Sequence, residues 1–225
     1  MPYRYKLAGA VSLVVGGLTT VLQFLITPVS GGDLSGSELV ATVTRHHTAM
    51  GWALALDLPL LLAAPAYLFL GSLAGARTSR LASTATAFLF FPFVVSCPPV
   101  FGFDGFAFLA GADPNKEAMA HLATSWQDSA WWAIGLFPYV LLQIAGSIML
   151  GIAFLRSKPV PSWVAIGTML WPALAVVGIE SGVRAIAVGG YAVLFATWSA
   201  CAAALLRDSA TIVQPAGPER VGISE

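Results

Sequence analysis

Six long apolar stretches limit what this chain can fold into more than any other feature of the sequence. They cover residues 7–26, 50–73, 81–103, 131–155, 163–179 and 183–206. A helix needs about 20 apolar residues to cross the roughly 30 Å of hydrocarbon in a bilayer. In lipid, only helices and closed barrels satisfy every backbone polar group. The sequence therefore predicts an all-α, polytopic transmembrane helix bundle with six spans.

The composition supports membrane insertion and argues against several other classes. Of the 225 residues, 57% are hydrophobic and 10% are charged, and the mean hydropathy is +0.80. A soluble domain usually carries about 25% charged residues, so we expect the lipid bilayer to be the main partner. The formal net charge of zero gives no basic field for nucleic acid, and a homo-oligomer is left open.

The two cysteines and three histidines predict neither a disulfide nor a metal site. Cys97 and Cys201 both lie in apolar runs, where a cysteine behaves as a small core residue. His46, His47 and His121 lack the spacing of metal ligands. The sequence also lacks a CxxC pair, an HExxH motif and a glycine-rich phosphate loop. We therefore expect no metal and no cofactor.

Every second segment between the predicted spans is basic, beginning with the segment before the first span. The basic residues of these segments are Arg4, Lys6, Arg77, Arg80, Arg156, Lys158 and Arg207. Because cytoplasmic loops are enriched in lysine and arginine, both termini are predicted to be cytoplasmic in a multi-pass protein of the cell membrane. Residues 1–206 form one domain in this prediction, and residues 207–225 form a disordered cytoplasmic tail.

The two long connections, residues 27–49 and 110–130, both fall on the predicted outer side. Long loops tend to carry function, so the outer face is where we expect it. The second connection is predicted to hold a short helix. Asp113 would be its N-cap, Pro114 its first residue and Glu117 part of its first turn.

The third span contains three prolines, at Pro92, Pro98 and Pro99. A proline removes a backbone donor and clashes with the preceding turn, so this span is predicted to be kinked or broken. Irregular backbone at membrane depth is tolerated only beside protein or water. The break should therefore border a cavity.

Asp57 places a carboxyl group in the middle of the second span. A charged side chain near the bilayer centre costs about 2.5–3.5 kcal/mol on insertion scales. Asp57 must then face protein or a water-filled cavity, either as a functional acid or in a structural hydrogen bond. His46 lies eleven residues earlier, which on a continuous helix places its side chain on the same face.

Polar residues also recur at helical spacing on two other spans. The fourth span carries Asp128, Trp132, Gly135, Tyr139 and Gln143, and the first carries Ser12, Gly16, Thr19 and Gln23. Asp104 closes the third span, and Glu180 and Arg184 are placed to pair at the turn before the sixth. Most of these groups belong to the outer half of the membrane, which predicts a polar-lined cavity that opens outward.

Two resemblances extend these predictions. The histidines before the second span and the motif Val160-Pro161-Ser162-Trp163 resemble small, uncharacterised six-span bacterial membrane proteins, which implies a fold but no activity. A looser likeness is to membrane-bound terpene cyclases, which use buried carboxylic acids and aromatic walls. That likeness implies acid roles for Asp57 and Glu180.

The leading hypothesis is an enzyme that cyclises or isomerises a lipophilic, isoprenoid-like substrate by acid initiation. An acid kept neutral by burial can act as a proton donor. The predicted catalytic residues are Asp57, Glu180, Asp104 and Asp128, and the predicted substrate-binding residues are Gln23, His46, Trp132, Tyr139, Gln143 and Arg184. Buried acids and broken helices equally suit a small transporter or proton-coupled permease. A non-catalytic accessory or immunity protein is the third alternative.

Overall fold

The computed structural model describes residues 2–29, 34, 36–75 and 78–210, and their regular structure is entirely α-helical. The helices are α1 (Tyr3–Ile26), α2 (Gly36–Arg45), α3 (His47–Leu60), α4 (Ala63–Leu73), α5 (Ser79–Ala112), α6 (Lys116–Gln127), α7 (Ala130–Ser157), α8 (Ser162–Glu180) and α9 (Arg184–Ala210). Five of them, α1, α5, α7, α8 and α9, are long and apolar enough to cross a membrane. The bent pair α3–α4 makes a sixth crossing if it counts as one span.

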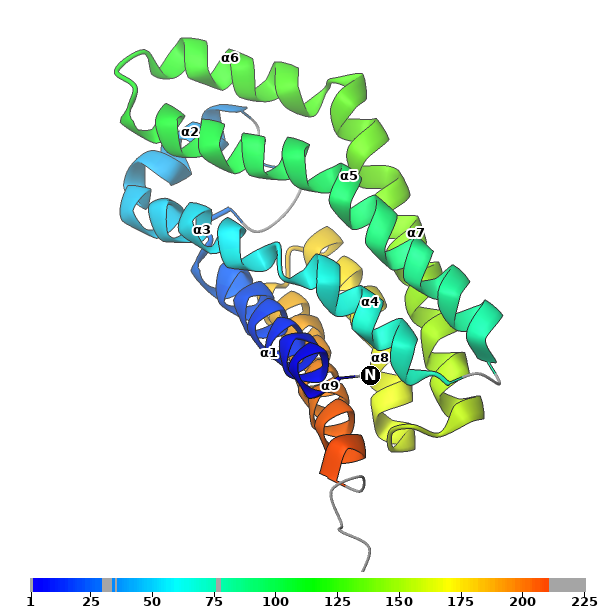
Figure 1. Cartoon of the computed structure of the whole chain (residues 1–225). Helices are drawn as coiled ribbons and strands as arrows, with labels where there is room; N and C mark the ends of the chain where they lie inside the picture. The colour runs from blue at the N-terminus through cyan, green and yellow to red at the C-terminus, as the bar shows by residue number, and fades with distance from the viewer. Residues whose placement is uncertain (1, 30–33, 35, 76–77, 211–225) are drawn as a thin grey trace, which may run out of the picture.

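These helices pack in a closed ring. Following the ring, α1 packs on α9, α9 on α8, α8 on α7, α7 on α5, and α5 on the bent pair, which returns to α1. Figure 1 shows α1, α8 and α9 on one side of the bundle and α5 and α7 on the other, with α4 in front. A ring of this kind leaves its centre to be filled by side chains or by a cavity.

The two ends of the bundle differ. We call the end that holds the N-terminus and the α4–α5 and α7–α8 turns the proximal end, and the end that holds α2, α6 and the α8–α9 turn the distal end (Figure 1). The proximal half of the ring is filled by apolar side chains that are fully buried, including Leu13, Leu70, Leu150 and Phe154. The interior of the ring is therefore filled by side chains in this half.

At the distal end, α5 continues well beyond the length that a membrane requires. Its 34 residues span about 50 Å at 1.5 Å per residue, against roughly 30 Å of hydrocarbon. The extension packs against α2, α3 and α6 around a second apolar core: Leu39, Val43, Met50, Phe103, Ala107 and Ala123. The segments predicted as long outer connections thus hold two helices that form a cap on one side of the ring.

The cap corrects two details of the sequence prediction. A helix in residues 110–130 is confirmed, but it begins at Lys116 and its N-cap is Asn115, whose side chain accepts a hydrogen bond from the backbone N–H of Ala118. Asp113 instead ends α5 and accepts a hydrogen bond from the N–H of Asn115. The helix α2 was not predicted. At the other end of the chain, α9 runs through Ala210, into the predicted tail, and residues 211–225 lie outside the described part.

The third span, predicted to be kinked or broken, is one continuous helix, and the broken span is the second. The helix α5 is uninterrupted from Ser79 to Ala112, because the fixed φ of proline is close to the helical value and the lost hydrogen bonds alone do not end it. The pair α3–α4 is bent by 41°. At this bend Leu61 and Leu62 donate to the carbonyls three residues before them, and Pro59 and Pro65, which lack N–H groups, bracket the turn.

The hairpin of α8 and α9 depends on a close backbone contact that a side chain would prevent. A Cβ atom at Gly178 would collide with the backbone N and Cα of Ala187. We expect Gly178→Ala to lower the free energy of unfolding by about 2 kcal/mol, because backbone atoms cannot move aside as a side chain can. Unfolding in mixed micelles measures this change.

Gly189 provides the matched control on the same hairpin. A Cβ atom there would meet nothing within 4 Å. Gly189→Ala should leave stability unchanged or raise it by up to about 1 kcal/mol, the difference in helix propensity. Equal destabilisation by both substitutions would contradict the close packing of α8 on α9.

Candidate functional site: a polar and aromatic cavity in the distal half of the bundle

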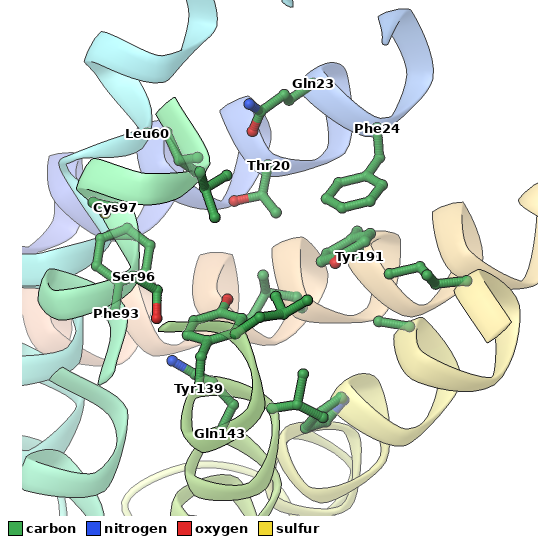
Figure 2. Close-up of a pocket in the computed structure, with 18 of the residues that line it drawn as sticks. Thr20, Gln23, Phe24, Leu60, Phe93, Ser96, Cys97, Tyr139, Gln143 and Tyr191 are labelled. Atoms are coloured by element: carbon green, nitrogen blue, oxygen red, sulfur yellow. The ribbon is translucent and has the colours of Figure 1, made fainter. Parts of the chain in front are cut away.

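The distal half of the ring encloses a cavity of about 280 Å³. Its lining comes from α1, α5, α7, α8 and α9, from Leu60 and Ala63 on either side of the bend, and from Tyr67 of α4. Figure 2 shows side chains from opposite sides of the ring pointing into the same space. The cavity thus lies where the polar residues of the sequence had been expected to gather.

Apart from the aromatic residues of α4, α8 and α9, the polar groups of the wall come from three helices. They are Thr20, Gln23 and Thr27 around α1, Ser96, Cys97 and Asp104 on α5, and Tyr139 and Gln143 on α7. Gln23, Asp104, Tyr139 and Gln143 were among the residues predicted from the sequence. The predicted stripe on the first span is also correct, since Ser12, Gly16, Thr19 and Gln23 are all buried on one face of α1.

Aromatic rings supply much of the remaining wall. The lining includes Phe24, Tyr67, Phe93, Phe101, Tyr139, Trp171, Tyr191 and Trp198. Phe24 and Tyr191 stack with their ring centroids 4.0 Å apart, which joins α1 to α9 across the cavity wall (Figure 2). Tyr67 meets Trp198 edge-on at 5.3 Å. These contacts hold the rings in fixed orientations, so the cavity has a defined shape.

Asp57 lies behind this wall and is connected to it by one hydrogen bond. The side chain is 4% exposed, and its Oδ1 accepts a hydrogen bond of 2.5 Å from Nε2 of Gln23. Its Oδ2 is buried and has no hydrogen-bond partner. The carboxyl group is close enough to Asp104 and Cys97 for electrostatic interaction. Asp57 therefore acts on the cavity through Gln23, while Asp104 lines it directly.

A second set of buried hydrogen bonds, centred on Gln143, supports the wall of the cavity. The Tyr67 hydroxyl donates to Oε1 of Gln143 over 3.2 Å, and Nε2 of Gln143 donates to the Leu89 carbonyl over 3.0 Å. Gln143 thus ties α4, α5 and α7 together at one point. Because both ends of its amide are engaged within the protein, we assign Gln143 to the support of the cavity rather than to contact with a ligand.

Several predicted site residues lie away from the cavity. Asp128 ends α6 and is exposed, and Glu180 ends α8 and is also exposed. His46 is exposed at the junction between α2 and α3, so it shares no helix face with Asp57. The side chain of Trp132 lies outside the described side chains, although its backbone belongs to α7. Asp128 and His46 were predicted on continuous helices that in fact end or turn beside them.

Arg184 has a different role from the predicted ion pair with Glu180. Its Nη2 donates to three carbonyl oxygens at the end of α1, those of Phe24, Leu25 and Thr27, at 3.1, 2.5 and 3.1 Å. Among the described residues, no ion pair joins it to Glu180. A cation at a helix C-terminus interacts favourably with the helix dipole. Arg184 therefore fixes the end of α1 against α9, next to the lining residues Phe24 and Thr27.

We expect Arg184→Ala to lower the free energy of unfolding by about 1 kcal/mol, since it removes a charged donor from exposed helix-terminal carbonyls. Glu180→Ala should leave stability unchanged. Unfolding of the two variants side by side checks this. Equal losses of stability in the two variants would support the ion pair predicted from the sequence and contradict the role assigned to the hydrogen bonds between Arg184 and α1.

The sequence prediction missed most of the aromatic wall and two polar residues of α5, Ser96 and Cys97. Tyr191 and Trp198 lie seven residues apart on α9, and Trp171 lies on α8 facing them. A signal was present, because these aromatic residues lie well inside their spans rather than at the membrane interface, where tyrosine and tryptophan are usually concentrated. Ser96 and Cys97 carried no comparable pattern.

Comparison with known proteins finds no family model that matches this chain, and no match among curated proteins or solved structures. The class of protein therefore rests on the structure itself. It is an all-α, multi-pass membrane protein whose helices surround a cavity with polar and aromatic walls.

Proposed function

We propose that this protein is a membrane enzyme that cyclises or isomerises a neutral, isoprenoid-like substrate in the distal cavity. The observation that carries the proposal is the combination of a carboxyl group and eight aromatic rings around one cavity within a membrane bundle. An enzyme that forms a carbocation needs an acid to start the reaction and aromatic faces to stabilise the charge. The resemblance to membrane-bound terpene cyclases supports the same reaction class.

In this proposal Asp104 is the proton donor, because it lines the cavity and Asp57 does not. The Asp104 O–H proton passes to one carbon of an alkene, and the other alkene carbon becomes a carbocation. A second double bond attacks this carbon to close a ring, or the cation rearranges. Loss of a proton from a neighbouring carbon then forms the new double bond and returns the proton to the carboxylate. Substrate and product are isomers, so no oxidant or reductant is required.

Asp57 is a positioning residue in this scheme. Its hydrogen bond fixes the Gln23 side chain, whose amide lines the cavity. When ionised, this second carboxyl group near the reacting centre also favours the cation electrostatically.

The proposed orientation follows from the charges at the two ends of the ring. The proximal end carries Arg4, Lys6, Arg80, Arg156, Lys158 and Arg207. By the positive-inside rule this end faces the cytoplasm, with the bent pair α3–α4 as one of six spans. The cavity then lies in the outer half of the bilayer, where a lipophilic substrate can reach it from the outer leaflet.

The test is conversion of a substrate panel by the purified protein in nanodiscs. The panel comprises geraniol, farnesol and geranylgeraniol, the corresponding hydrocarbons and their terminal epoxides, and products are separated by gas chromatography with mass detection. The expected result is a product of unchanged mass and altered retention time. Unchanged substrates across the panel would overturn the proposed activity.

One observation favours a second candidate, a proton-coupled permease. The unpartnered Oδ2 of Asp57 lies just before the bend between α3 and α4, and discontinuous helices with ionisable groups are typical of transporter binding sites. Uptake of a lipophilic solute into proteoliposomes under a proton gradient, abolished by Asp57→Asn, would support transport. No difference from empty liposomes would exclude it for that solute.

A further inference from the structure

We propose that the cavity binds a lipophilic organic monocation, an ammonium ion that carries alkyl or aryl groups, in preference to a neutral molecule of the same shape. The inference rests on the proposed function for the position of the site and its affinity for apolar molecules. It goes further by assigning a charge to the tightest ligand, whether that ligand resembles a reaction intermediate or is a natural cation.

The ionisable groups of the cavity are all acids, and a bound cation favours their deprotonated, negatively charged form. Asp104 belongs to the wall, and Asp57 lies directly behind Gln23 with one oxygen unpartnered. Among the described residues that line the cavity, none is lysine, arginine or histidine. The guanidinium of Arg184 is occupied with the carbonyls at the end of α1. A cation in the cavity would therefore interact with two carboxyl groups and with no competing positive charge.

The rings add a second source of attraction for a cation. The face of an aromatic ring carries negative electrostatic potential, which attracts an ammonium group within about 6 Å of the centroid. Tyr191 contacts both Phe24, at 4.0 Å, and Trp171, at 6.1 Å, so three rings from α1, α8 and α9 meet at one side of the cavity. Such a group is characteristic of sites for alkylated ammonium ions.

The remainder of the wall indicates an organic cation rather than a metal ion. A metal such as calcium needs six or more oxygen ligands, and no group of three His, Cys, Asp or Glu in the described part of the chain could hold a metal ion. Apolar side chains such as Leu60, Val140 and Leu194 line the cavity instead. The cavity volume of about 280 Å³ is close to the lower end of the range for ligand pockets, about 300–1,000 Å³, and so suits a compact cation.

The experiment compares two probes of the same shape. Benzyltrimethylammonium carries the charge, and neopentylbenzene replaces its nitrogen with carbon. Binding of each to the full chain in nanodiscs is measured by isothermal titration calorimetry, with empty nanodiscs subtracted. The expected result is a dissociation constant at least tenfold lower for the ammonium probe. Equal affinity for the two probes, or no binding of the ammonium probe, would overturn the inference.

Substitutions in the cavity wall test which side chains cause the preference for the ammonium probe. Asp104→Asn should weaken ammonium binding at least tenfold and leave neopentylbenzene unchanged, and Phe24→Leu should weaken it severalfold. Glu117→Gln removes an exposed carboxyl group on α6 and should have no effect. Asp57→Asn is the second test of the charge. If it fails to fold, Asp104→Asn decides alone, and unaltered ammonium binding in that variant would overturn the inference.

The outcome is separable from that of the proposed function. Charge-selective binding without conversion of any substrate would support a cation-binding membrane protein and contradict the proposed enzyme. Conversion of a substrate without a preference for the charged probe would support the enzyme and overturn the inference of a cation site.

Discussion

Replacing Gln23 with leucine is expected to lower the free energy of unfolding by about 3 kcal/mol. The Gln23 amide is the hydrogen-bond partner of the Asp57 carboxyl group, whose other oxygen already has none. The substitution leaves a carboxyl group that is 4% exposed without any hydrogen bond. A buried charged or polar group that loses its partner costs about 3 kcal/mol. Unfolding in mixed micelles measures the loss.

Two further variants separate the orphaned carboxyl group from a simple packing effect. Asp57→Leu should cost only about 1 kcal/mol, because the Gln23 amide that it leaves free lines the cavity and can bind water there. The double variant Gln23→Leu with Asp57→Leu should recover most of the stability, since both polar groups are gone. A double variant as unstable as Gln23→Leu alone would show that the loss comes from packing and that Asp57 is satisfied in another way.

Asp104→Asn is expected to reduce substrate conversion at least a hundredfold while the protein remains folded. Asparagine has the shape of aspartic acid but cannot donate the initiating proton, and general acid catalysis contributes about 10²–10⁴ in rate. Asp104 is only partly buried, so the neutral amide is expected to be tolerated. Initial rates on the substrate that the wild-type protein converts best, beside thermal unfolding of both proteins, measure the two effects.

Two comparisons control this prediction. Glu117→Gln, on the cap, should convert substrate at the wild-type rate. Asp57→Asn should reduce conversion less than Asp104→Asn, because Asp57 reaches the cavity only through Gln23. A rate in Asp57→Asn far below that in Asp104→Asn would transfer the role of proton donor to Asp57, and wild-type rates in both would remove acid initiation.

The membrane fold was predictable because each spanning helix requires about 20 largely apolar residues in succession, and such stretches are visible in the sequence itself. Each predicted span corresponds to a helix or to the bent pair α3–α4. The position of the bend was not predictable from prolines alone. Three prolines in α5 leave the helix continuous, whereas Pro59 and Pro65 bracket a turn that changes to shorter-range hydrogen bonds. Packing against neighbouring helices decides between these outcomes, and the sequence does not show it.

The candidate site was predictable where polar residues lie well inside a span. Gln23, Tyr139 and Gln143 reach the cavity or its supports because buried helix faces repeat every three to four residues. Asp128, Glu180 and His46 lie at helix ends, where one or two residues of error change the direction of a side chain completely. Arg184 shows a further limit, since its partners on α1 lie about 160 residues away in the sequence.

The distal half of the bundle encloses a cavity that small molecules can reach, whereas the interior of the proximal half is filled by packed side chains. The two native cysteines test it directly, since Cys97 lines the cavity and Cys201 is fully buried in the proximal core. Native protein in nanodiscs is treated with excess N-ethylmaleimide at mildly alkaline pH and analysed by peptide mass spectrometry. The account predicts an adduct on Cys97 and none on Cys201 until the protein is unfolded. Labelling of Cys201 as fast as Cys97, or of neither before unfolding, would contradict it.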